Sequence, residues 1–180
     1  MIRKARLSRR QFVERLKNIK LLALDVDGVL TDDSIYFGPD GFELKRFNIS
    51  DGFLMKLAMR AGLEVAIVSG RYSTSTESRM KDLGVKHVMQ GMKEKTAMLE
   101  PLLAKLKIDF SEVAFVGNDL LDIKLAGKVG LPIAVNDAHR SLKAVASYVT
   151  GRKGGQGAIR EILELYFKAR GLDPKDFIVG

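Results

Sequence analysis

Residues 21–31 of this 180-residue chain read Leu-Leu-Ala-Leu-Asp-Val-Asp-Gly-Val-Leu-Thr, and this stretch decides the fold. The apolar run 21–24 is short, continuous and followed by a glycine-containing turn, which is typical of a buried strand. Asp25 and Asp27 come next, so we expect two carboxylates at the carboxyl edge of a sheet, where open α/β folds bind their ligands. Such a pair favours a hard divalent cation, and one of the two acids could attack phosphorus. The stretch therefore predicts a magnesium-dependent phosphatase.

Strand-like and helix-like patterns alternate from residue 21 onward. Strands are predicted at 21–25, 64–68, 86–89, 112–116 and 131–135, and helices at 51–61, 74–83, 93–106, 119–129, 138–145 and 157–169. Thr74 with Glu77 forms a candidate capping box, and Gly62, Gly84 and Gly130 stand where helices should end. The alternation predicts an α/β fold with a doubly wound parallel sheet, Rossmann-like in its layout.

Residues 32–47 interrupt this alternation. The turn sequence Gly-Pro-Asp-Gly at 38–41 lies between aromatic-containing segments, which predicts a β-hairpin inserted beside the paired acids. We expect three parts in the chain: a basic N-terminal helix at 1–20, a single domain at 21–170 that includes the hairpin, and a C-terminal tail at 171–180.

The composition bounds the class of protein. With 46% hydrophobic residues, 180 residues can bury one sizeable core. The absence of cysteine excludes disulfides and thiolate metal sites. No apolar run approaches the roughly 20 residues that span a bilayer, and no secretory signal is evident. We therefore expect a cytoplasmic enzyme or binding protein without a membrane partner.

The net charge of +8 is a local feature. Residues 1–20 hold eight basic residues and one acid, which leaves 22 basic and 21 acidic residues in the remainder. Nucleic-acid binding needs a basic surface on the folded body, so no nucleic-acid partner is expected. Ser8 with Gln11 resembles a capping box, and Phe12 and Leu16 fall at helical spacing, which favours a surface helix packed on the body. A targeting presequence or an anchor to an anionic surface is the alternative.

Three further polar clusters follow predicted strands or open a helix. Ser69-Gly70-Arg71 follows the strand at 64–68, and Gly117-Asn118-Asp119, with Asp122 one helical turn on, follows the strand at 112–116. Lys95 stands near the start of the helix at 93–106. Because parallel strands present their carboxyl ends at one edge of a sheet, these side chains and the acid pair are expected to converge on one crevice.

With these motifs in this order, the sequence resembles the haloacid dehalogenase superfamily of phosphatases. The resemblance covers about residues 20–167 and is closest to its small branch without a cap domain, which hydrolyses phosphorylated sugar acids. It is carried further by Asn-Ile-Ser-Asp-Gly-Phe at 48–53, Gln-Gly at 90–91 and Gly-Gln-Gly-Ala-Ile-Arg-Glu at 155–161. The resemblance implies a phosphoric monoester hydrolase without a separate cap domain.

The resemblance also implies catalytic roles. Asp25 is the expected nucleophile, forming an aspartyl-phosphate, and Asp27 the expected general acid and base. Ser69 and Lys95 are expected to hold phosphoryl oxygens, with Lys95 offsetting negative charge throughout the reaction.

A Mg²⁺ cofactor is implied with the same acids. Its expected ligands are a carboxylate oxygen of Asp25, the main-chain carbonyl of Asp27, and Asn118, while Asp119 and Asp122 bind metal-bound water or ligate directly. Many relatives have aspartate where Asn118 stands. We therefore expect weaker metal binding, and Asp119 is the alternative direct ligand.

Substrate contacts are expected from Ser69, Gly70, Arg71, Lys95 and Thr31, with Arg71 clamping a sugar carboxylate. The implied substrate is 3-deoxy-D-manno-octulosonate 8-phosphate, which would place the chain in lipopolysaccharide biosynthesis. The implied assembly is a homotetramer in which the hairpin at 32–47 contacts the neighbouring active site.

Three alternatives stay open at this stage. One is a phosphatase for another phosphosugar, such as a nonulosonate 9-phosphate. Another is a non-catalytic oligomerisation module of the same fold, against which the intact set of Asp25, Asp27, Ser69 and Lys95 argues. A signalling receiver domain would carry its phosphorylated aspartate after the third strand, and here the acid pair follows the first.

Overall fold

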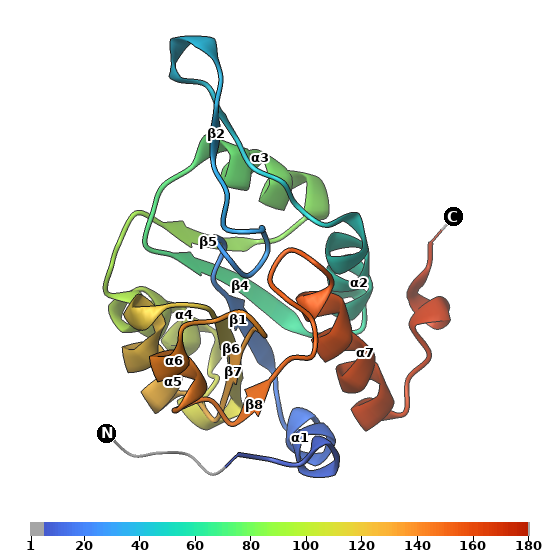
Figure 1. Cartoon of the computed structure of the whole chain (residues 1–180). Helices are drawn as coiled ribbons and strands as arrows, with labels where there is room; N and C mark the ends of the chain where they lie inside the picture. Colours follow the sequence, from blue (N-terminus) through green and yellow to red (C-terminus); the bar gives the residue numbers. More distant parts are fainter. Residues whose placement is uncertain (1–5, 180) are drawn as a thin grey trace.

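The computed structural model describes residues 6–179 and confirms the predicted fold class. Six parallel strands form the central sheet in the order β5-β4-β1-β6-β7-β8 (Figure 1). The strands are β1 (Leu21–Leu24), β4 (Glu64–Ser69), β5 (His87–Gln90), β6 (Val113–Gly117), β7 (Leu131–Ala134) and β8 (Tyr148–Val149). The order reverses between β4 and β6, on either side of β1, so the crevice that such sheets use for ligands opens at the end of β1.

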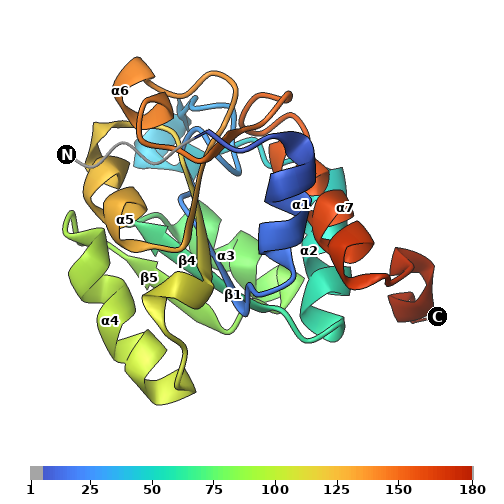
Figure 2. The ribbon, with the colours of Figure 1, turned by 90° about the horizontal axis from the view of Figure 1, so that it is seen from below.

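Helices cover both faces of the sheet. They are α1 (Arg9–Leu16), α2 (Ile49–Arg60), α3 (Thr74–Leu83), α4 (Lys95–Leu106), α5 (Ile123–Lys128), α6 (Arg140–Lys143) and α7 (Ala158–Arg170). Helix α7 packs against both α1 and α2 on one face, while α4 and α5 lie together on the other (Figure 2). Short 3-10 turns occur at Pro39–Gly41, Phe110–Glu112, Leu120–Asp122 and Pro174–Phe177.

The centre of the core is β1, which is buried along its whole length. It pairs in register with β4 on one side and β6 on the other, so its residues face helices above and below the sheet. The continuous apolar run at 21–24 is what such a doubly covered strand requires. The N–H of Asp25 still donates to the carbonyl of Val116 at 3.0 Å, so the sheet itself fixes where the first acid stands.

Most predicted boundaries differ from the observed ones by one or two residues, but four features differ from the prediction by more than that. The helix predicted at 119–129 is a 3-10 turn followed by α5, and the helix predicted at 138–145 shrinks to α6. Strand β8 was missed because it contributes only two residues. The cap of α3 is Ser73 and not Thr74: Ser73 has the extended backbone of a cap, and its hydroxyl accepts the N–H of Thr76 at 3.3 Å.

The N-terminal segment packs on the body. The capping box of Ser8 and Gln11 is present as predicted, and Phe12 and Leu16 are buried. The ring of Phe12 stacks on Tyr148 with 3.9 Å between centroids. Residues 1–5 and 180 lie outside the described chain, so the division into N-terminal helix, domain and tail stays a prediction. Within residues 6–179, no helix is both long enough and apolar enough to cross a membrane.

The predicted hairpin is present and projects from the body as a separate antiparallel ribbon (Figure 1). Its strands are β2 (Tyr36–Phe37) and β3 (Glu43–Leu44). The tip reverses direction through Asp40 and Gly41, which have φ of 62° and 76°. Aspartate and glycine tolerate this left-handed region best among the residues available for a turn.

The glycine-rich loop at 151–157 packs directly on the turn that follows β1. The N–H of Gly155 donates to the carbonyl of Val29 at 2.9 Å. A Cβ at Gly154 would lie 1.8 Å from the carbonyl oxygen of Gly28, which leaves no room for any side chain. Two backbone segments about 125 residues apart in sequence thus touch without side chains between them, and the loop supports the acid-bearing turn.

Gly154→Ala is expected to destabilise the protein by about 3 kcal/mol, because backbone and not a flexible side chain occupies the space of the new methyl group. Urea unfolding measures the difference. Gly127→Ala is the matched control, since its Cβ meets nothing within 4 Å on the exposed side of α5. The free energy of unfolding of Gly127→Ala should rise by up to about 1 kcal/mol. Equal stability of the two variants would show that the loop does not press on the turn.

Candidate active site

A cavity of about 400 Å³ opens at the carboxyl edge of the sheet, beyond β1, β4 and β6. It is lined by Asp25, Asp27, Asp33, Ser69, Gly70, Arg71, Lys93, Lys95, Asn118, Asp119 and Leu121. Of the residues singled out from sequence, all but Thr31 and Asp122 line this cavity. The convergence expected from the strand ends is therefore present in three dimensions.

The turn after β1 holds the two acids in place through backbone hydrogen bonds. The N–H groups of Val29, Leu30 and Thr31 donate to the carbonyl of Val26 at 2.9–3.2 Å. Thr31 is fully buried, and its hydroxyl accepts the N–H of Gly28 at 3.3 Å. The structure thus places Thr31 beneath the turn and not at the cavity wall, where it was expected to contact substrate.

Gly28 has a φ of 72°, and a Cβ there would lie 2.0 Å from Asn118 Nδ2. The glycine therefore meets two needs, the left-handed turn and the close approach of the Asn118 amide. This approach brings the amide next to the backbone of the acid-bearing turn.

Lys95 is buried and joins two carboxylates. Its Nζ lies 2.6 Å from Asp25 Oδ2 and 2.6 Å from Asp122 Oδ1. Burial alone would lower the pKa of Lys95, but the charges of Asp25 and Asp122 raise it above its usual value. Burial, followed by the charge of Asp122, raises the pKa of Asp25 to about 7, although Lys95 acts in the opposite direction.

Asp122 is fully buried behind the cavity. Its Oδ2 accepts the N–H groups of Asn118 and Asp119 at 2.8 and 3.0 Å, and its Oδ1 accepts from Lys95. Both oxygens therefore hold the loop after β6 and the ammonium of Lys95. The structure gives Asp122 an organising position, whereas the sequence suggested direct ligation or a bond to metal-bound water.

Ser69 and Arg71 form a tight turn at the end of β4. The hydroxyl of Ser69 accepts the N–H of Arg71 at 3.3 Å and donates to its carbonyl at 3.0 Å. The Arg71 guanidinium makes a forked contact with Glu43 of β3, one arm of which measures 2.6 Å. Glu43 also accepts from the Ser73 hydroxyl at 2.7 Å.

Sequence reasoning missed Glu43, Lys45 and Asp33. Glu43 and Lys45 come from the returning strand of the hairpin and contact two residues that line the cavity, Glu43 at Arg71 and Lys45 at Asp27, with Lys45 Nζ 2.6 Å from Asp27 Oδ1. Asp33 lies just after the acid-bearing turn and could have been found from that adjacency. Burial raises its pKa, and the negative charges of Asp27, Asp119 and other nearby aspartates raise it further.

The donor set at the cavity suits Mg²⁺. Carboxylates, an amide oxygen and main-chain carbonyls are the hard oxygen ligands that this ion prefers. Burial is the first cause of the raised pKa of Asp33, and the charges of Asp27 and Asp119 add to it, so a cation bound nearby would offset that second part. Within residues 6–179, no three His, Cys, Asp or Glu side chains form a ready-made metal group. The predicted set differs from such a group, because it combines the Asp25 carboxylate with the Asp27 carbonyl and the Asn118 amide, and has Asp119 and Asp122 as direct ligands or partners of metal-bound water.

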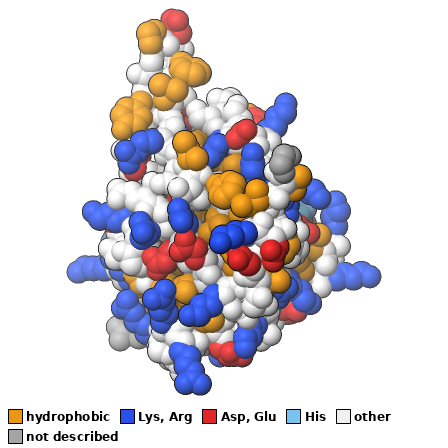
Figure 3. Space-filling model, turned by 90° about the vertical axis from the view of Figure 1, so that its right-hand side faces the viewer, with side chains coloured by type: hydrophobic (Ala, Val, Ile, Leu, Met, Phe, Trp, Pro, Cys, Tyr) orange, Lys and Arg blue, Asp and Glu red, His pale blue; other side chains and the backbone are white. Residues whose placement is uncertain are grey.

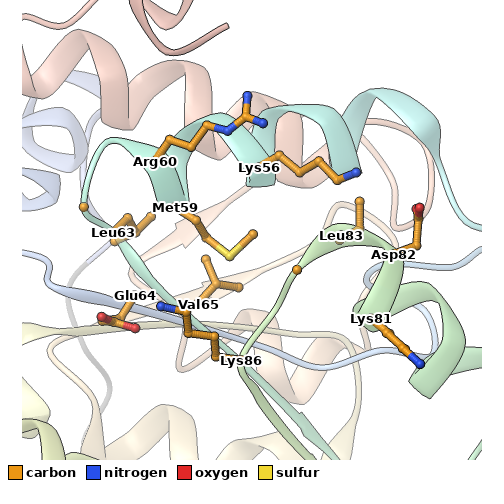
Figure 4. A pocket seen from close by; sticks show the side chains of 12 residues that line it. Lys56, Met59, Arg60, Leu63, Glu64, Val65, Lys81, Asp82, Leu83 and Lys86 are labelled. Atoms are coloured by element: carbon orange, nitrogen blue, oxygen red, sulfur yellow. The ribbon is translucent and has the colours of Figure 1, made fainter. Parts of the chain in front are cut away.

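A second cavity of similar volume lies elsewhere, between the C-terminal ends of α2 and α3 and the start of β4 (Figure 4). Met59, Leu63, Val65 and Leu83 form its apolar part. The basic side chains at its rim, such as Lys81, point in different directions and do not converge on a common point (Figure 4). None of the predicted site residues lines it, so the chemistry belongs to the cavity beyond β1.

Comparison with known proteins agrees with this geometry. A family model described as haloacid dehalogenase-like hydrolase matches residues 87–162. A 1.95 Å crystal structure from Yersinia pestis, of 3-deoxy-D-manno-octulosonate 8-phosphate phosphatase, has a TM-score of 0.87 to this chain at 42% identity, covering 89% of this chain and 86% of that one. The chain is therefore a hydrolase of the haloacid dehalogenase superfamily, as its motifs predicted.

The family within that superfamily is equally clear. The 3-deoxy-D-manno-octulosonate 8-phosphate phosphatase KdsC of Escherichia coli (strain K12) is 46% identical over 159 residues, which cover 88% of this chain and 85% of that protein. The Moraxella catarrhalis phosphatase of this name, solved in complex with a magnesium ion, a phosphate ion and a KDO molecule, has a TM-score of 0.87 at 38% identity, over 90% of this chain and 93% of that one. The chain belongs to the 3-deoxy-D-manno-octulosonate 8-phosphate phosphatase family.

The raised pKa of Asp25 predicts a pH dependence of stability in the metal-free protein. Asp25 binds its proton more tightly in the folded protein, at a pKa of about 7, than in the unfolded chain, near 3.8. Raising the pH through this interval therefore destabilises the fold. Asp25→Asn should remove this part of the dependence and melt several degrees higher than wild type at pH 8.

Thermal melting in chelator at pH 5 and pH 8 measures the effect. Asp33 and Asp51 also have raised pKa values, but they are present in both proteins, so the difference between the two isolates Asp25. If the melting temperatures of wild type and Asp25→Asn changed equally with pH, the raised pKa of Asp25 would be contradicted.

Proposed function

We propose that this protein hydrolyses 3-deoxy-D-manno-octulosonate 8-phosphate to the free sugar acid and phosphate, with Mg²⁺ as cofactor. The observation that carries the proposal is the pairing of the buried Asp25 carboxylate with Lys95 at the base of an oxygen-rich cavity. The names of the relatives supply the substrate, and the bound magnesium of the Moraxella catarrhalis structure supports the cofactor.

Asp25, the main-chain carbonyl of Asp27 and the amide of Asn118 would hold the Mg²⁺ ion, with Asp119 as the alternative to Asn118. When bound, the ion screens the repulsion between a carboxylate nucleophile and an anionic phosphate. Because Asn118 is neutral where an aspartate would be negatively charged, we expect weaker metal binding.

The chemistry on the chain's own residues takes two displacements. A carboxylate oxygen of Asp25 forms a bond to phosphorus while the bond from phosphorus to the sugar oxygen breaks, and Asp27 gives that oxygen a proton. Water then attacks phosphorus, Asp27 takes a proton back, and the Asp25 carboxylate leaves. Lys95 and Ser69 hold the phosphoryl oxygens and stabilise their charge in both steps.

Arg71 is the proposed contact for the sugar carboxylate. Its guanidinium lines the cavity and is 37% exposed in its side chain, so donors remain available beside the contact with Glu43. Specificity for an acidic sugar would then follow from this one cation.

The quaternary structure is a further part of the proposal. The hairpin exposes Tyr36, Phe37 and Phe42, at 53%, 71% and 63%. Hydrophobic side chains lie along this projection, which stands clear of the body (Figure 3). An isolated two-stranded ribbon is marginally stable in water, which favours packing against another copy. We infer a homotetramer in which the hairpin covers a neighbouring cavity. The cytoplasmic location expected from the sequence stays a prediction.

The direct test is phosphate release from a panel of phosphosugars, with Mg²⁺ and then with chelator. Metal-dependent turnover that strongly favours 3-deoxy-D-manno-octulosonate 8-phosphate supports the proposal. A preference for a nonulosonate 9-phosphate would show that the substrate is a different phosphorylated sugar acid. No turnover of any member would favour a non-catalytic module of the same fold.

Arg71→Ala is expected to reduce kcat/KM for the sugar acid phosphate by about 100-fold, as loss of a charge-assisted bidentate contact costs roughly 2–3 kcal/mol. An aryl phosphate without a carboxylate should be affected far less. Arg140→Ala, at an exposed arginine of α6, is the matched control and should leave both substrates unchanged. Equal losses on both substrates in Arg71→Ala would exclude the carboxylate clamp.

A further inference from the structure

Lys45 follows β3 directly, where the hairpin returns to the body, and its side chain has no exposed surface. Its Nζ lies 2.6 Å from Asp27 Oδ1, an ion pair outside hydrogen-bond geometry. Within residues 6–179 this is the only ion pair that Asp27 makes. An ammonium group without solvent is costly unless charged partners surround it, so this buried contact fixes both side chains.

The surroundings of Lys45 hold its ammonium in one place. Thr76 Oγ1 lies 3.4 Å away and accepts a hydrogen bond from it, and Glu43 Oε1 lies at 3.9 Å. Glu43 is itself held by Arg71 and by the hydroxyl of Ser73. Lys45 is therefore anchored at the junction of the hairpin with the start of α3, and not merely attracted to Asp27.

The two oxygens of Asp27 differ as a result. Oδ1 is buried against Lys45, whereas the side chain as a whole is 25% exposed and lines the cavity. Oδ2 is thus the oxygen available to the cavity. A carboxylate whose first oxygen is fixed can present its second oxygen in a constant direction, which is what proton transfer to a leaving group requires.

We propose that Lys45 is a positioning residue that aims Asp27 at the leaving-group oxygen. The proposal rests on the proposed function, because it assigns Lys45 a task only if Asp27 transfers protons. It also gives the hairpin a part in the chemistry of its own subunit, since Lys45 directly follows β3, the second strand of the hairpin.

Leaving groups separate this role from a structural one. A sugar alkoxide needs a proton to leave, whereas p-nitrophenolate leaves without one. Lys45→Met should therefore lower kcat for the sugar phosphate by about 100-fold, the usual scale of general acid catalysis. Transfer of the phosphoryl group from p-nitrophenyl phosphate to Asp25 should persist. Hydrolysis of the intermediate, which needs Asp27 as base, should slow, so the variant should show a burst of nitrophenolate.

Rapid-mixing kinetics with both substrates, at saturating Mg²⁺, makes the comparison. Arg46→Met is the matched control: it removes a positive charge from the next residue, whose partner is Asp32 at 2.9 Å and not Asp27. It should show neither the selective loss nor the burst. Thermal melting checks that each variant is folded. If Lys45→Met does not fold, Lys45→Gln is used for the same comparison.

A double variant identifies the residue through which Lys45 acts. Adding Lys45→Met to Asp27→Asn should change kcat by less than about twofold, because the group that Lys45 positions is already disabled. The positioning role would be overturned if the loss of kcat in the double variant equalled the product of the two single losses. It would also be overturned if Lys45→Met lost activity equally on both substrates and showed no burst. Wild type that hydrolyses neither ester would overturn the proposed function instead, so the two failures are distinguishable.

Discussion

The structure depends on one buried ammonium, that of Lys95, placed 2.6 Å from both Asp25 and Asp122. Three charges share a region with almost no solvent, and removing the cation would leave two carboxylates uncompensated. The arrangement also joins three parts of the chain: the end of β1, the start of α4 and the loop after β6. The first acid therefore cannot move without disturbing the other two segments.

The same contact prepares the site for its chemistry. Asp122 uses its second oxygen to hold the N–H groups of Asn118 and Asp119, so the proposed metal-binding loop is fixed from behind. Lys95 partly offsets the burial that raises the pKa of Asp25, and a bound cation would act in the same direction. A carboxylate held this way is poised to act as a nucleophile when cation and substrate bind.

The sequence predicted what depends on local pattern. Continuous apolar runs located the central strands, and polar residues immediately after them located Asp25, Ser69 and Asn118, because parallel strands end at one edge. The sequence could not show which acids point into the cavity. Asp122 sits one turn beyond Asp119, and its place behind the cavity depends on hydrogen bonds from Lys95, Asn118 and Asp119. It also depends on the missing side chain of Gly117, where a Cβ would lie 2.5 Å from Asp122 Oδ2.

Contacts made by the hairpin were out of reach for a different reason. Glu43 and Lys45 lie in a segment whose alternation indicated two strands but not the direction in which the ribbon returns. Their partners, Arg71 and Asp27, are 28 and 18 residues away in sequence, and no spacing rule links such pairs. The prediction of the α3 cap was wrong for a similar reason. Ser73, the observed cap, has an extended backbone and also donates a hydrogen bond to Glu43 of the hairpin.

The most direct test of the central claim, that Asp25 is the nucleophile, is to trap the covalent intermediate. Asp27→Asn, in which hydrolysis of an aspartyl-phosphate should be slow, is quenched during turnover of p-nitrophenyl phosphate, whose leaving group needs no proton from residue 27. The protein is then reduced with borohydride, and its peptides are analysed by mass spectrometry. The account predicts homoserine in place of aspartate at position 25, only when substrate and Mg²⁺ were both present. Reduction at another carboxylate, or an unmodified Asp25 in a variant that has turned over substrate, would contradict it.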